Sequence, residues 1–504
     1  MKKKREKTVR ILTYVGFLVT AIIIIIALLG FSPEKEPAVV AEVPTKVEES
    51  PIETQETEED LTELLSPTPT KEPEPTSEPT DVPTLTPTDV PEPTEEPLAG
   101  PYGPDPEDFP AGMNMLTGEM VSNPELLNYP PAMVSVTNWP VTARPQPGLG
   151  SASLVYELYI GEGMSRFLTL FYGEYPEPVA NTEESSEGEE NSQDSSDDGT
   201  TTGTTGLAFD NSNADSIGPI RSGRLPYESI RNLNNGFLVM ASAYAGVAQN
   251  LDQFTNVLGS DAEDINSAKI SVVELKNLAA TYEGNLVEGV LSGNRFDENA
   301  PDGGVPGETF WFIYNSINQI AWQYDPEAEA YYRYADQADG TTYKRLIDGM
   351  TGESVDVSNV VLLYAHHRYC NFKAFQIDFY DMNGMPAVLF RDGQKYDINW
   401  TTVNTEFELE TGKRRPIRFI DEEGNPFPLK PGPTWIILAP MYTPIWESEM
   451  MEEIPLDAID WLPEQPDVQF LGLLNKRLQD TGIWVSRFYQ DLMIQDSTVC
   501  AQMN

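Results

Sequence analysis

Four arginines are the residues of this chain whose types and positions point most directly to chemistry. They are Arg144, Arg166, Arg221 and Arg224, and each stands beside a Gly, Pro or Ser turn. An arginine guanidinium binds a carboxylate or a phosphate through two parallel hydrogen bonds. Arg221 and Arg224 also precede a predicted helix, whose free N–H groups and dipole favour an anion. The pattern therefore predicts an anion-binding site.

Glu157 and Ser222 are the predicted supporting residues of this site. Glu157 lies on a predicted strand, where its carboxylate can pair with one of the arginines. Ser222 is expected to cap the following helix, because Ser accepts hydrogen bonds from the free N–H groups at a helix start. A buried Arg–Glu network that only fixes the fold explains the same residues, since such networks are commonly structural. Both interpretations stay open.

Sequence patterns that would indicate catalysis are weaker than the pattern that indicates anion binding. Ser222 has no Gly-x-Ser-x-Gly elbow and no nearby histidine to act as its base. Glu157 and Glu162 are candidates for a carboxylate pair that cleaves glycans, but positions five apart on one strand face opposite sides unless the turn at Gly161 redirects one. We therefore expect a non-catalytic binding or scaffolding protein. The alternative is a histidine-independent, carboxylate-based hydrolase or transferase that acts on cell-wall glycan.

Metal and cofactor signals are sparse, because the chain has two cysteines and two histidines. His366 and His367 are adjacent at the end of a predicted strand, so they point to opposite faces and do not easily share a metal. Cys370 and Cys500 are too few for a disulfide framework, and their spacing does not decide whether they form one bridge. Phosphate-loop and dinucleotide fingerprints do not occur in their strand–helix context. We expect no metal and no cofactor.

The charge balance excludes one class of partner. The 504 residues carry 32 Lys and Arg against 80 Asp and Glu, a net charge of −48. The stretch 181–216 contributes ten of the acids and no base. Nucleic acid is not an expected partner, because phosphate binding along a duplex needs a basic face.

The amino-terminal region predicts a membrane anchor. Residues 1–10 form a basic head, and the 21 residues 11–31 carry no charge, which is about the length that an α-helix needs to cross a bilayer. Basic flanks stay in the cytoplasm, so we expect a single-pass protein of the cell membrane with its N-terminus inside and its bulk outside. A cleaved signal peptide is the alternative, but it has a shorter apolar core and a small-residue cleavage site.

Residues 32–105 predict a disordered tether of Pro, Thr and Glu. The part from 32 to 100 contains no aromatic residue and carries 19 acids against 3 bases. Such a composition cannot bury enough apolar surface to fold, and its prolines and like charges extend the chain. A tether of this kind lifts a folded domain away from the membrane.

The folded sequence predicts an α+β protein in two parts. Residues 106–304 alternate strand and helix patterns, which is typical of a layered α/β domain, with a disordered acidic insert at 179–216. The predicted helices there are 226–234 and 247–258. Residues 305–440 carry short apolar runs separated by turn pairs such as Asn383-Gly384, which predicts a mainly antiparallel β domain. The tail 441–504 is acidic and then helical, and its role is open.

Seven short segments carry a family resemblance. They are 143–146 (ARPQ), 154–157 (LVYE), 163–167 (GMSRF), 218–224 (GPIRSGR), 348–352 (DGMTG), 390–393 (FRDG) and 430–436 (KPGPTWI). Together they resemble the YerB-like bacterial envelope proteins, a two-part domain of unknown function. The resemblance covers 106–440 and implies an extracytoplasmic, membrane-attached protein, often a lipoprotein. A cell-wall polymer or another envelope protein is then the expected partner, besides the membrane itself.

This chain departs from that pattern at two places that matter for chemistry. Relatives tend to have a histidine before a Gly-Gly-Ser-like turn, where residues 241–246 here read Ala-Ser-Ala-Tyr-Ala-Gly. They also tend to have a Pro-His-Asn motif, where this chain has Pro301-Asp302-Gly303. A general-base role of those histidines therefore does not transfer. A predicted helix anchor also stands where many relatives use a lipidated cysteine.

Overall fold

The computed structural model describes residues 100–178, 214–261, 263–340, 343–371, 374–447 and 482–503. The predicted basic head (1–10), the predicted membrane helix (11–31), nearly all of the tether and most of the acidic insert lie outside these residues. So does the central part of the tail, 448–481. Within the described ranges, no helix is both long and apolar enough to cross a membrane.

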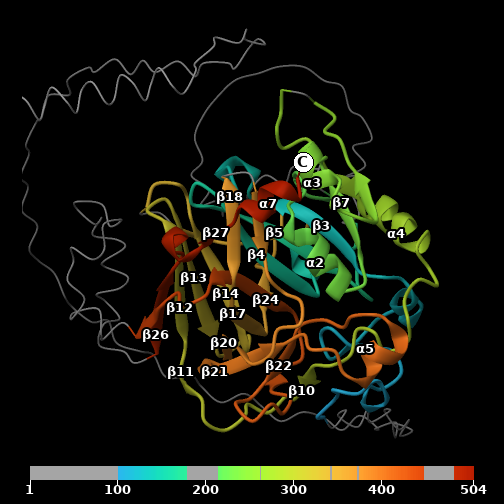
Figure 1. Cartoon of the computed structure of the whole chain (residues 1–504), viewed down its shortest axis with the longest axis vertical. Coiled ribbons are helices and arrows are strands. Elements are labelled where there is room, and N and C mark those ends of the chain that lie inside the picture. Colours follow the sequence, from blue (N-terminus) through green and yellow to red (C-terminus); the bar gives the residue numbers. More distant parts are fainter. Residues whose placement is uncertain are drawn as a thin grey trace, which may run out of the picture. The chain divides into compact units, whose positions relative to one another are not determined.

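The largest element of the fold is an 11-stranded sheet (Figure 1). Its strands, in spatial order, are β11 (Val305–Pro306), β21 (Gln394–Thr401), β20 (Met385–Arg391), β17 (Asn359–Ala365), β24 (Thr434–Pro440), β4 (Leu154–Gly161), β5 (Met164–Phe171), β3 (Ala132–Thr137), β7 (Phe237–Met240) and β8 (Phe254–Asn256), with β22 (Arg418–Ile420) paired to β21. β24 and β4 pair in parallel, with Trp435 opposite Val155. The two sequence halves therefore share one continuous sheet, and their predicted division at residue 304 stays a prediction.

A second sheet of seven strands packs against one face of the first. Its order is β15 (Tyr343–Arg345), β14 (Ala330–Asp336), β13 (Asn318–Asp325), β12 (Thr309–Asn315), β26 (Ile483–Arg487) and β25 (Ile445–Glu447), with β16 (Asp356–Val357) beside β14. The core between the sheets contains Phe310, Trp322 and Tyr331 from the second sheet and Phe167 and Trp435 from the first. β12, β13 and β14 form an antiparallel meander.

β17 shows why the central strands form. It reads Asn-Val-Val-Leu-Leu-Tyr-Ala and is buried along its whole length, as expected for an apolar run covered on both faces. Val360 and Leu362 belong to the core shared with the second sheet, and Val361 and Leu363 belong to the core on the opposite face. That alternation follows from the two-residue period of a strand.

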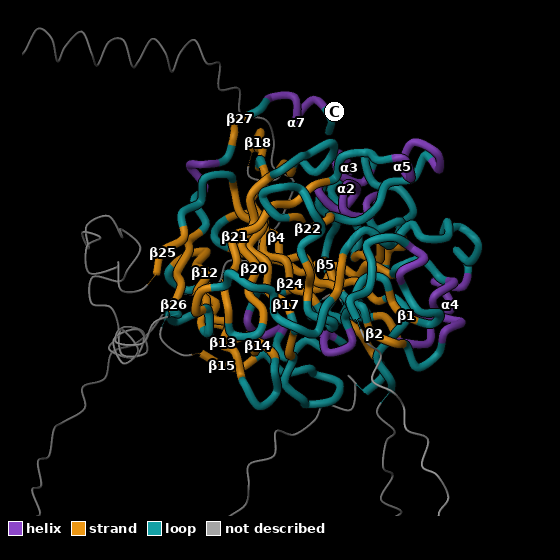
Figure 2. The backbone as a smooth tube through the Cα atoms, turned by 90° about the horizontal axis from the view of Figure 1, so that it is seen from below, coloured by secondary structure: helices purple, strands orange, loops and turns teal. Residues whose placement is uncertain are grey.

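Smaller elements complete the fold. They are the three-stranded sheet β19 (Ala374–Ile377), β18 (His367–Asn371) and β27 (Ile494–Gln495), and the two-stranded pairs β1 (Met113–Asn114) with β2 (Glu119–Met120), β6 (Ser216–Ile217) with β9 (Ile270–Ser271), and β10 (Arg295–Phe296) with β23 (Pro428–Leu429). The described helices are short: α2 (Pro226–Leu233), α3 (Ala245–Ala248), α4 (Val272–Ala280), α5 (Glu406–Thr411) and α7 (Ser497–Ala501). Figure 2 shows strands in the middle of the molecule and these helices around them.

The fold is mixed and mostly β, with few helices and several sheets, so the predicted combination of helices and strands is confirmed at that level. The predicted helix at 226–234 corresponds to α2. The helix predicted at 247–258 is wrong: α3 ends at Ala248, and the chain then forms β8. Pairing overrides the local pattern there, because Val257 donates its N–H to the Met240 carbonyl of β7 at 2.8 Å.

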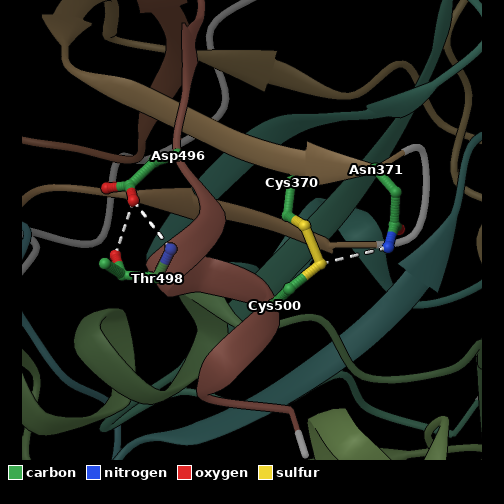
Figure 3. Close-up of a disulfide and its surroundings, with 5 residues drawn as sticks. All are labelled: Cys370, Asn371, Asp496, Thr498 and Cys500. Carbon is green, nitrogen blue, oxygen red and sulfur yellow. Dashed lines mark hydrogen bonds between the residues drawn. A yellow bond between two sulfur atoms is a disulfide. The ribbon is translucent and has the colours of Figure 1, made fainter.

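The end of the tail is fastened to the fold by a disulfide between Cys370 in β18 and Cys500 in α7 (Figure 3). Asp496 caps α7 by accepting hydrogen bonds from the Thr498 amide at 2.8 Å and its hydroxyl at 2.7 Å. After α7, the Gln502 carbonyl accepts a hydrogen bond from Asn250 beside α3 at 2.7 Å. The tail is therefore an integral part of two sheets and of the packing around α3.

Candidate functional site

The four predicted arginines all lie near the carboxyl end of β3. β3 and β7 are parallel neighbours, and β5 runs antiparallel to β3 with Arg166 opposite Thr137. The loop 218–224 and the start of α2 reach the same edge, because α2 connects this loop to β7. Ligands of open sheets with parallel strands commonly bind outside the carboxyl ends of the strands. The edge is therefore a reasonable place for a binding site.

The loop 218–224 is held between the ends of β3 and β7 by backbone hydrogen bonds. The Arg221 amide donates to the Ser135 carbonyl at 2.8 Å, and the Gly223 amide donates to the Ser242 carbonyl at 2.9 Å. Gly223 is required by this packing, since a Cβ there would lie 2.4 Å from the Met240 sulfur. Two arginines on the loop are thus carried by a backbone that is fixed on both sides.

Arg166, Arg221 and Arg224 form one group, here called the open arginine cluster. Burial, followed by the charges of Arg224 and Arg221, lowers the pKa of Arg166 to about 10 against an opposing effect of Tyr227. Burial also lowers the pKa of Arg224 and of Arg221. Arg166 is 7% exposed, while Arg221 and Arg224 are half-buried. The side chains at the loop therefore remain partly accessible to solvent.

The open arginine cluster has few partners. Arg166 donates to the Ser222 carbonyl at 2.7 Å, Arg221 to Asn266 Oδ1 at 2.9 Å, and Arg224 to the adjacent Gly223 carbonyl at 3.1 Å. None of the three forms an ion pair with a carboxylate of the described residues. The buried Nε of Arg166 also lacks a hydrogen-bond partner in the described part of the chain. Positive charge is concentrated here, and Asp264, which raises the pKa of Arg221, forms no ion pair with it.

Arg144 lies apart from this cluster, in a second polar group. It donates to the Asp336 carbonyl at 2.6 Å and to Asn138 Oδ1 at 3.0 Å. Its pKa is lowered to about 10 by burial and by the charge of Arg333, while Glu157 and Asp336 oppose the shift. The structure thus brings three of the four predicted arginines together and places the fourth beside Arg333.

Glu157 forms a buried ion pair with Arg333. It is fully buried and accepts hydrogen bonds from Arg333 at 3.0 and 3.1 Å, from Ser165 at 2.7 Å and from Trp435 at 3.0 Å. The Arg333 guanidinium lies 5.1 Å from the Phe167 ring and 5.2 Å from the Trp435 ring. This ion pair joins β4 of the large sheet to β14 of the second sheet, as the structural interpretation of Glu157 requires.

Ser222 does not cap α2, and Glu162 differs from Glu157 in its environment. The residue before α2 is Leu225, which makes no side-chain cap, so the expected capping role of Ser222 is wrong. Ser222 is partly exposed between the two loop arginines and contributes its carbonyl to Arg166. Glu162 is exposed in the turn between β4 and β5, where its φ is 54°, while Glu157 points into the core.

Ser242 and Asn266 are neighbours of the open arginine cluster that sequence reasoning missed. Ser242 is exposed and has a φ of 62°, and its carbonyl accepts a hydrogen bond from the Gly223 amide. Strained left-handed residues other than glycine are enriched at functional sites. The segment 241–246 gave a signal in the sequence, since it departs from the family pattern. Asn266 gave none, because it reaches Arg221 from a distant loop.

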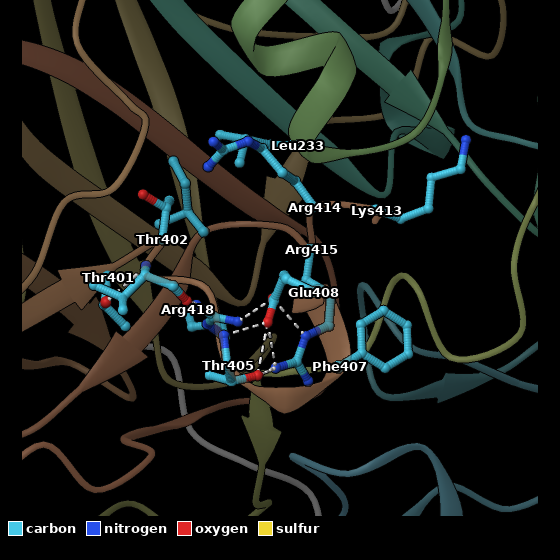
Figure 4. A network of polar contacts seen from close by, with 12 residues as sticks. Leu233, Thr401, Thr402, Thr405, Phe407, Glu408, Lys413, Arg414, Arg415 and Arg418 are labelled. Atoms are coloured by element: carbon cyan, nitrogen blue, oxygen red, sulfur yellow. Dashed lines mark hydrogen bonds and ion pairs between the residues drawn. The ribbon is translucent and has the colours of Figure 1, made fainter. Parts of the chain in front are cut away.

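A second arginine group, also missed, surrounds Glu408 of α5 (Figure 4). Arg415 donates to Glu408 Oε1 at 2.9 Å, Arg418 donates to the same atom at 2.5 Å, and Thr405 donates to Oε2 at 2.6 Å. Burial raises the pKa of Glu408, but these hydrogen bonds and the Arg418 charge outweigh it and lower that pKa to about 2. The basic run 413–418 in an acidic chain was the available signal.

The two histidines do not form a metal site. His367 is buried, contacts the Ala365 carbonyl through Nδ1 at 3.0 Å, and has its pKa lowered to about 4 by burial. Its ring lies against Phe488, 5.8 Å between centroids. Within the described ranges, no three His, Cys, Asp or Glu side chains are grouped so as to hold a metal ion.

Two protein-family models match parts of this chain. The family model "Protein of unknown function (DUF3048) N-terminal domain" matches residues 116–182, and the model of its C-terminal domain matches residues 311–436. The chain carries both parts of this two-part domain of unknown function. Arg144, Glu157 and Arg166 fall inside the first match, whereas Arg221 and Arg224 lie between the two.

A Bacillus subtilis (strain 168) protein, "Putative lipoprotein YerB", is 26% identical over 330 residues, which cover 62% of this chain and 81% of that protein. The predicted YerB-like resemblance is confirmed, and the chain is homologous to that protein. The crystal structure of YerB from Bacillus subtilis shares 20% sequence identity and aligns with a TM-score of 0.46 over 65% of this chain and 96% of YerB.

Proposed function

We propose that this protein is a membrane-attached, extracytoplasmic binding protein of the bacterial cell envelope. Its open arginine cluster captures an anionic group that belongs to a wall polymer or to a partner protein. One observation carries the proposal: Arg166, Arg221 and Arg224 gather at a strand end without an ion-pair partner among the described residues, in a chain with 80 acidic residues.

The physical argument rests on the cost of unpaired charge. Like charges close together lower one another's pKa, as Arg224 and Arg221 do for Arg166. An acidic chain has many carboxylates with which to neutralise a structural arginine, and it does so at Arg231, Arg368, Arg391 and Arg414. A cluster left without such a partner gains most when a bound anion supplies the missing charge.

Localisation outside the cytoplasm has two supports. The Cys370–Cys500 disulfide joins residues 130 positions apart, and structural disulfides persist mainly in oxidising compartments. The Bacillus relative is named as a lipoprotein. In this chain the predicted helix at 11–31 would provide the membrane attachment, with the tether carrying the folded part outward.

The burial of Glu157 argues against it as the catalytic carboxylate of the hydrolase or transferase alternative. Every hydrogen bond of Glu157 described above comes from the protein interior, and the side chain is fully buried. Replacing Glu157 by Gln is expected to unfold the protein rather than to stop a reaction, because Arg333 would be left buried without its charge partner. A loss of activity in that variant would therefore say nothing about catalysis.

The test is co-sedimentation of the full-length protein, purified in mild detergent, with intact cell-wall sacculi at about 0.05 M and about 0.5 M salt. Retention is expected at low salt and is expected to fall at high salt, since screening weakens charge attraction. The double variant Arg221→Gln/Arg224→Gln should lose retention.

The matched control is Lys344→Gln/Lys413→Gln, which removes the same charge from two exposed lysines outside the cluster. It should be retained like the wild type. Equal loss in both double variants would show a net-charge effect and contradict a directed site. If the wild type is not retained, cross-linking in membranes should follow to find an acidic protein partner.

A further inference from the structure

The strand β8 (Phe254–Asn256) forms an open edge of the large sheet beside the open arginine cluster. Among the described strands β8 pairs with β7 alone, and the sheet order ends there. The Leu238 amide donates to the Gln253 carbonyl at 2.8 Å, and the Val257 amide donates to the Met240 carbonyl at 2.8 Å. In a strand, backbone groups alternate in direction, so those of Phe254 and Asn256 point away from β7.

These outward backbone groups are free to pair. No hydrogen bond within the described ranges involves the amide or carbonyl of Phe254 or Asn256 on the outer side of β8. An edge strand of this kind is a template for one more strand from another chain. A partner that adds itself here would gain main-chain hydrogen bonds regardless of its sequence.

Three large apolar side chains are exposed around the same end of the sheet. Tyr244 follows β7 and is 59% exposed, Leu258 follows β8 and is 77% exposed, and Ile265 precedes the Arg221 partner Asn266 and is 59% exposed. Single exposed apolar residues are ordinary, but several of them around one strand edge and one binding group favour a protein partner. A polyol-phosphate or other highly charged polymer has little apolar surface to place against them.

The arginines lie within reach of a strand added to β8. β3, β7 and β8 are consecutive neighbours, so β8 is about 10 Å from β3 at the strand spacing of the sheet. Arg221 and Arg224 occupy the loop at the carboxyl ends of β3 and β7, which is also the carboxyl end of β8. A glutamate of the partner at that end can meet an extended arginine side chain.

Charged side chains of this protein lie near both ends of β8. At its amino end Glu228 accepts the Asp252 amide at 2.8 Å and also pairs with Arg231. At the carboxyl end, the charge of Asp264 raises the pKa of Arg221 and so partly offsets the effect of burial. Asp264 Oδ1 already accepts a hydrogen bond from the Asn266 amide at 2.8 Å. Asp261 and Glu263 are also exposed in the loop after β8, so acidic residues of a partner are expected where they reach Arg221 and Arg224.

We propose that the occupant of this surface is an extended segment of a partner protein that pairs with β8, places apolar side chains against Tyr244, Leu258 and Ile265, and presents carboxylates to Arg221 and Arg224. This inference rests on the proposed function, because it names the source of the anion that the open arginine cluster takes. It commits to an acidic, apolar peptide strand and not to a wall polymer.

The probe is a fluorescent peptide of about eight residues that alternates valine and glutamate, measured by anisotropy against the full-length protein in detergent. Three comparisons accompany it: the peptide with alternate amides N-methylated, the peptide with Glu changed to Gln, and inorganic polyphosphate as competitor. N-methylation removes the edge hydrogen bonds without changing the protein, so a folding defect cannot imitate its effect.

The parent peptide is expected to bind, and N-methylation and Glu→Gln are each expected to weaken binding about tenfold or more. Arg221→Gln/Arg224→Gln should do the same, and Leu258→Asn should weaken binding about fivefold. These outcomes together support strand addition.

Three results would overturn it. Equal binding of the methylated and parent peptides would exclude strand pairing while leaving the anion site in place. Arginine-dependent binding of polyphosphate without binding of any peptide would exclude a protein strand and retain the proposed function. Failure of both probes to bind in an arginine-dependent manner would overturn the inference and the proposed function together.

Discussion

Arg415 and Arg418 share one carboxylate, whereas Arg166, Arg221 and Arg224 pair with none of the described carboxylates. Each group combines a strand arginine, Arg166 of β5 or Arg418 of β22, with arginines on loops. Burial lowers the pKa of Arg418 as it lowers those of the open cluster. Around Arg415 and Arg418, however, Glu408 supplies a negative charge and several hydrogen bonds (Figure 4). A compensated group holds the fold together; an uncompensated group is suited to hold something else.

The two groups should therefore respond in opposite ways to the removal of a charge. In the Glu408 group, each charge satisfies a buried partner, so its loss leaves an unpaired ion in the interior. In the open arginine cluster, each charge repels its neighbours, so its loss relieves repulsion. Stability is the sensitive readout for the first group, and ligand binding is the sensitive readout for the second.

Among the variants of these two arginine groups, the largest effect is expected for Glu408→Gln. The substitution leaves Arg415 and Arg418 buried without their carboxylate and should lower the free energy of unfolding by about 3–5 kcal/mol. Denaturant unfolding measures it, with Glu410→Gln on the exposed side of the same helix as control. A loss below about 1 kcal/mol would mean that the two groups do not differ as described.

Removal of the disulfide should loosen the side of the molecule that carries the open arginine cluster. Cys370→Ser/Cys500→Ser is expected to cost about 2–4 kcal/mol, because the bridge closes a long loop. α7 and the residues after it contact α3, so amide hydrogen exchange should rise at 245–250. Exchange at 405–418 should stay as it is. A uniform rise over both regions would argue against a local effect.

Acid should weaken the Glu408 group and leave the open arginine cluster unaffected. The pKa of Glu408 falls from its ordinary 4.5 to about 2 on folding, so the unfolded chain binds the proton first as pH falls. The stability from this carboxylate is present above pH 4.5 and is lost as pH falls towards 2. The difference in unfolding free energy between wild type and Glu408→Gln should shrink over that window. A pH-independent difference would contradict a charge effect.

His367 adds a separate acid response at higher pH. Its pKa is lowered to about 4 in the folded protein, below its ordinary 6.5. Stability therefore falls as pH drops from 6.5 towards 4, because the unfolded chain takes up a proton that the buried ring does not. His367→Gln should remove this slope while leaving the lower window of Glu408 in place, which keeps the two responses distinguishable.

The smallest change in stability is expected for Arg224→Gln. Arg224 forms no ion pair with a described carboxylate, so its removal leaves none of those carboxylates without a partner. The free energy of unfolding of the variant should lie within about 0.5 kcal/mol of the wild-type value, or slightly above it, in a buffer without anionic ligand. Arg418→Gln is the matched variant in the compensated group and should be clearly destabilised. Thermal unfolding of both measures the contrast, and equal destabilisation would show that Arg224 has a structural role like that of Arg418.

Much of the local structure could be predicted from the sequence, and much of the site could not. The runs 132–137 and 360–364 are strands because apolar, β-branched residues occupy successive positions. The assignment of 247–258 as a helix failed, since pairing with β7 decides that segment. The choice of arginines was partly useful: Arg166, Arg221 and Arg224 meet, but Arg144 joins the Glu157–Arg333 group instead.

The sequence by itself determined the acidic character of this protein, the mixture of helices and strands, and the YerB-like family resemblance, because these depend on composition and short motifs. The tertiary structure alone decided which charges are paired. Glu157 pairs with Arg333, which is 176 positions away in the sequence, and Arg221 donates a hydrogen bond to Asn266, which is 45 positions away. Ion pairing and desolvation act over a few ångströms, so they are set by the packing of distant segments, which no local pattern encodes.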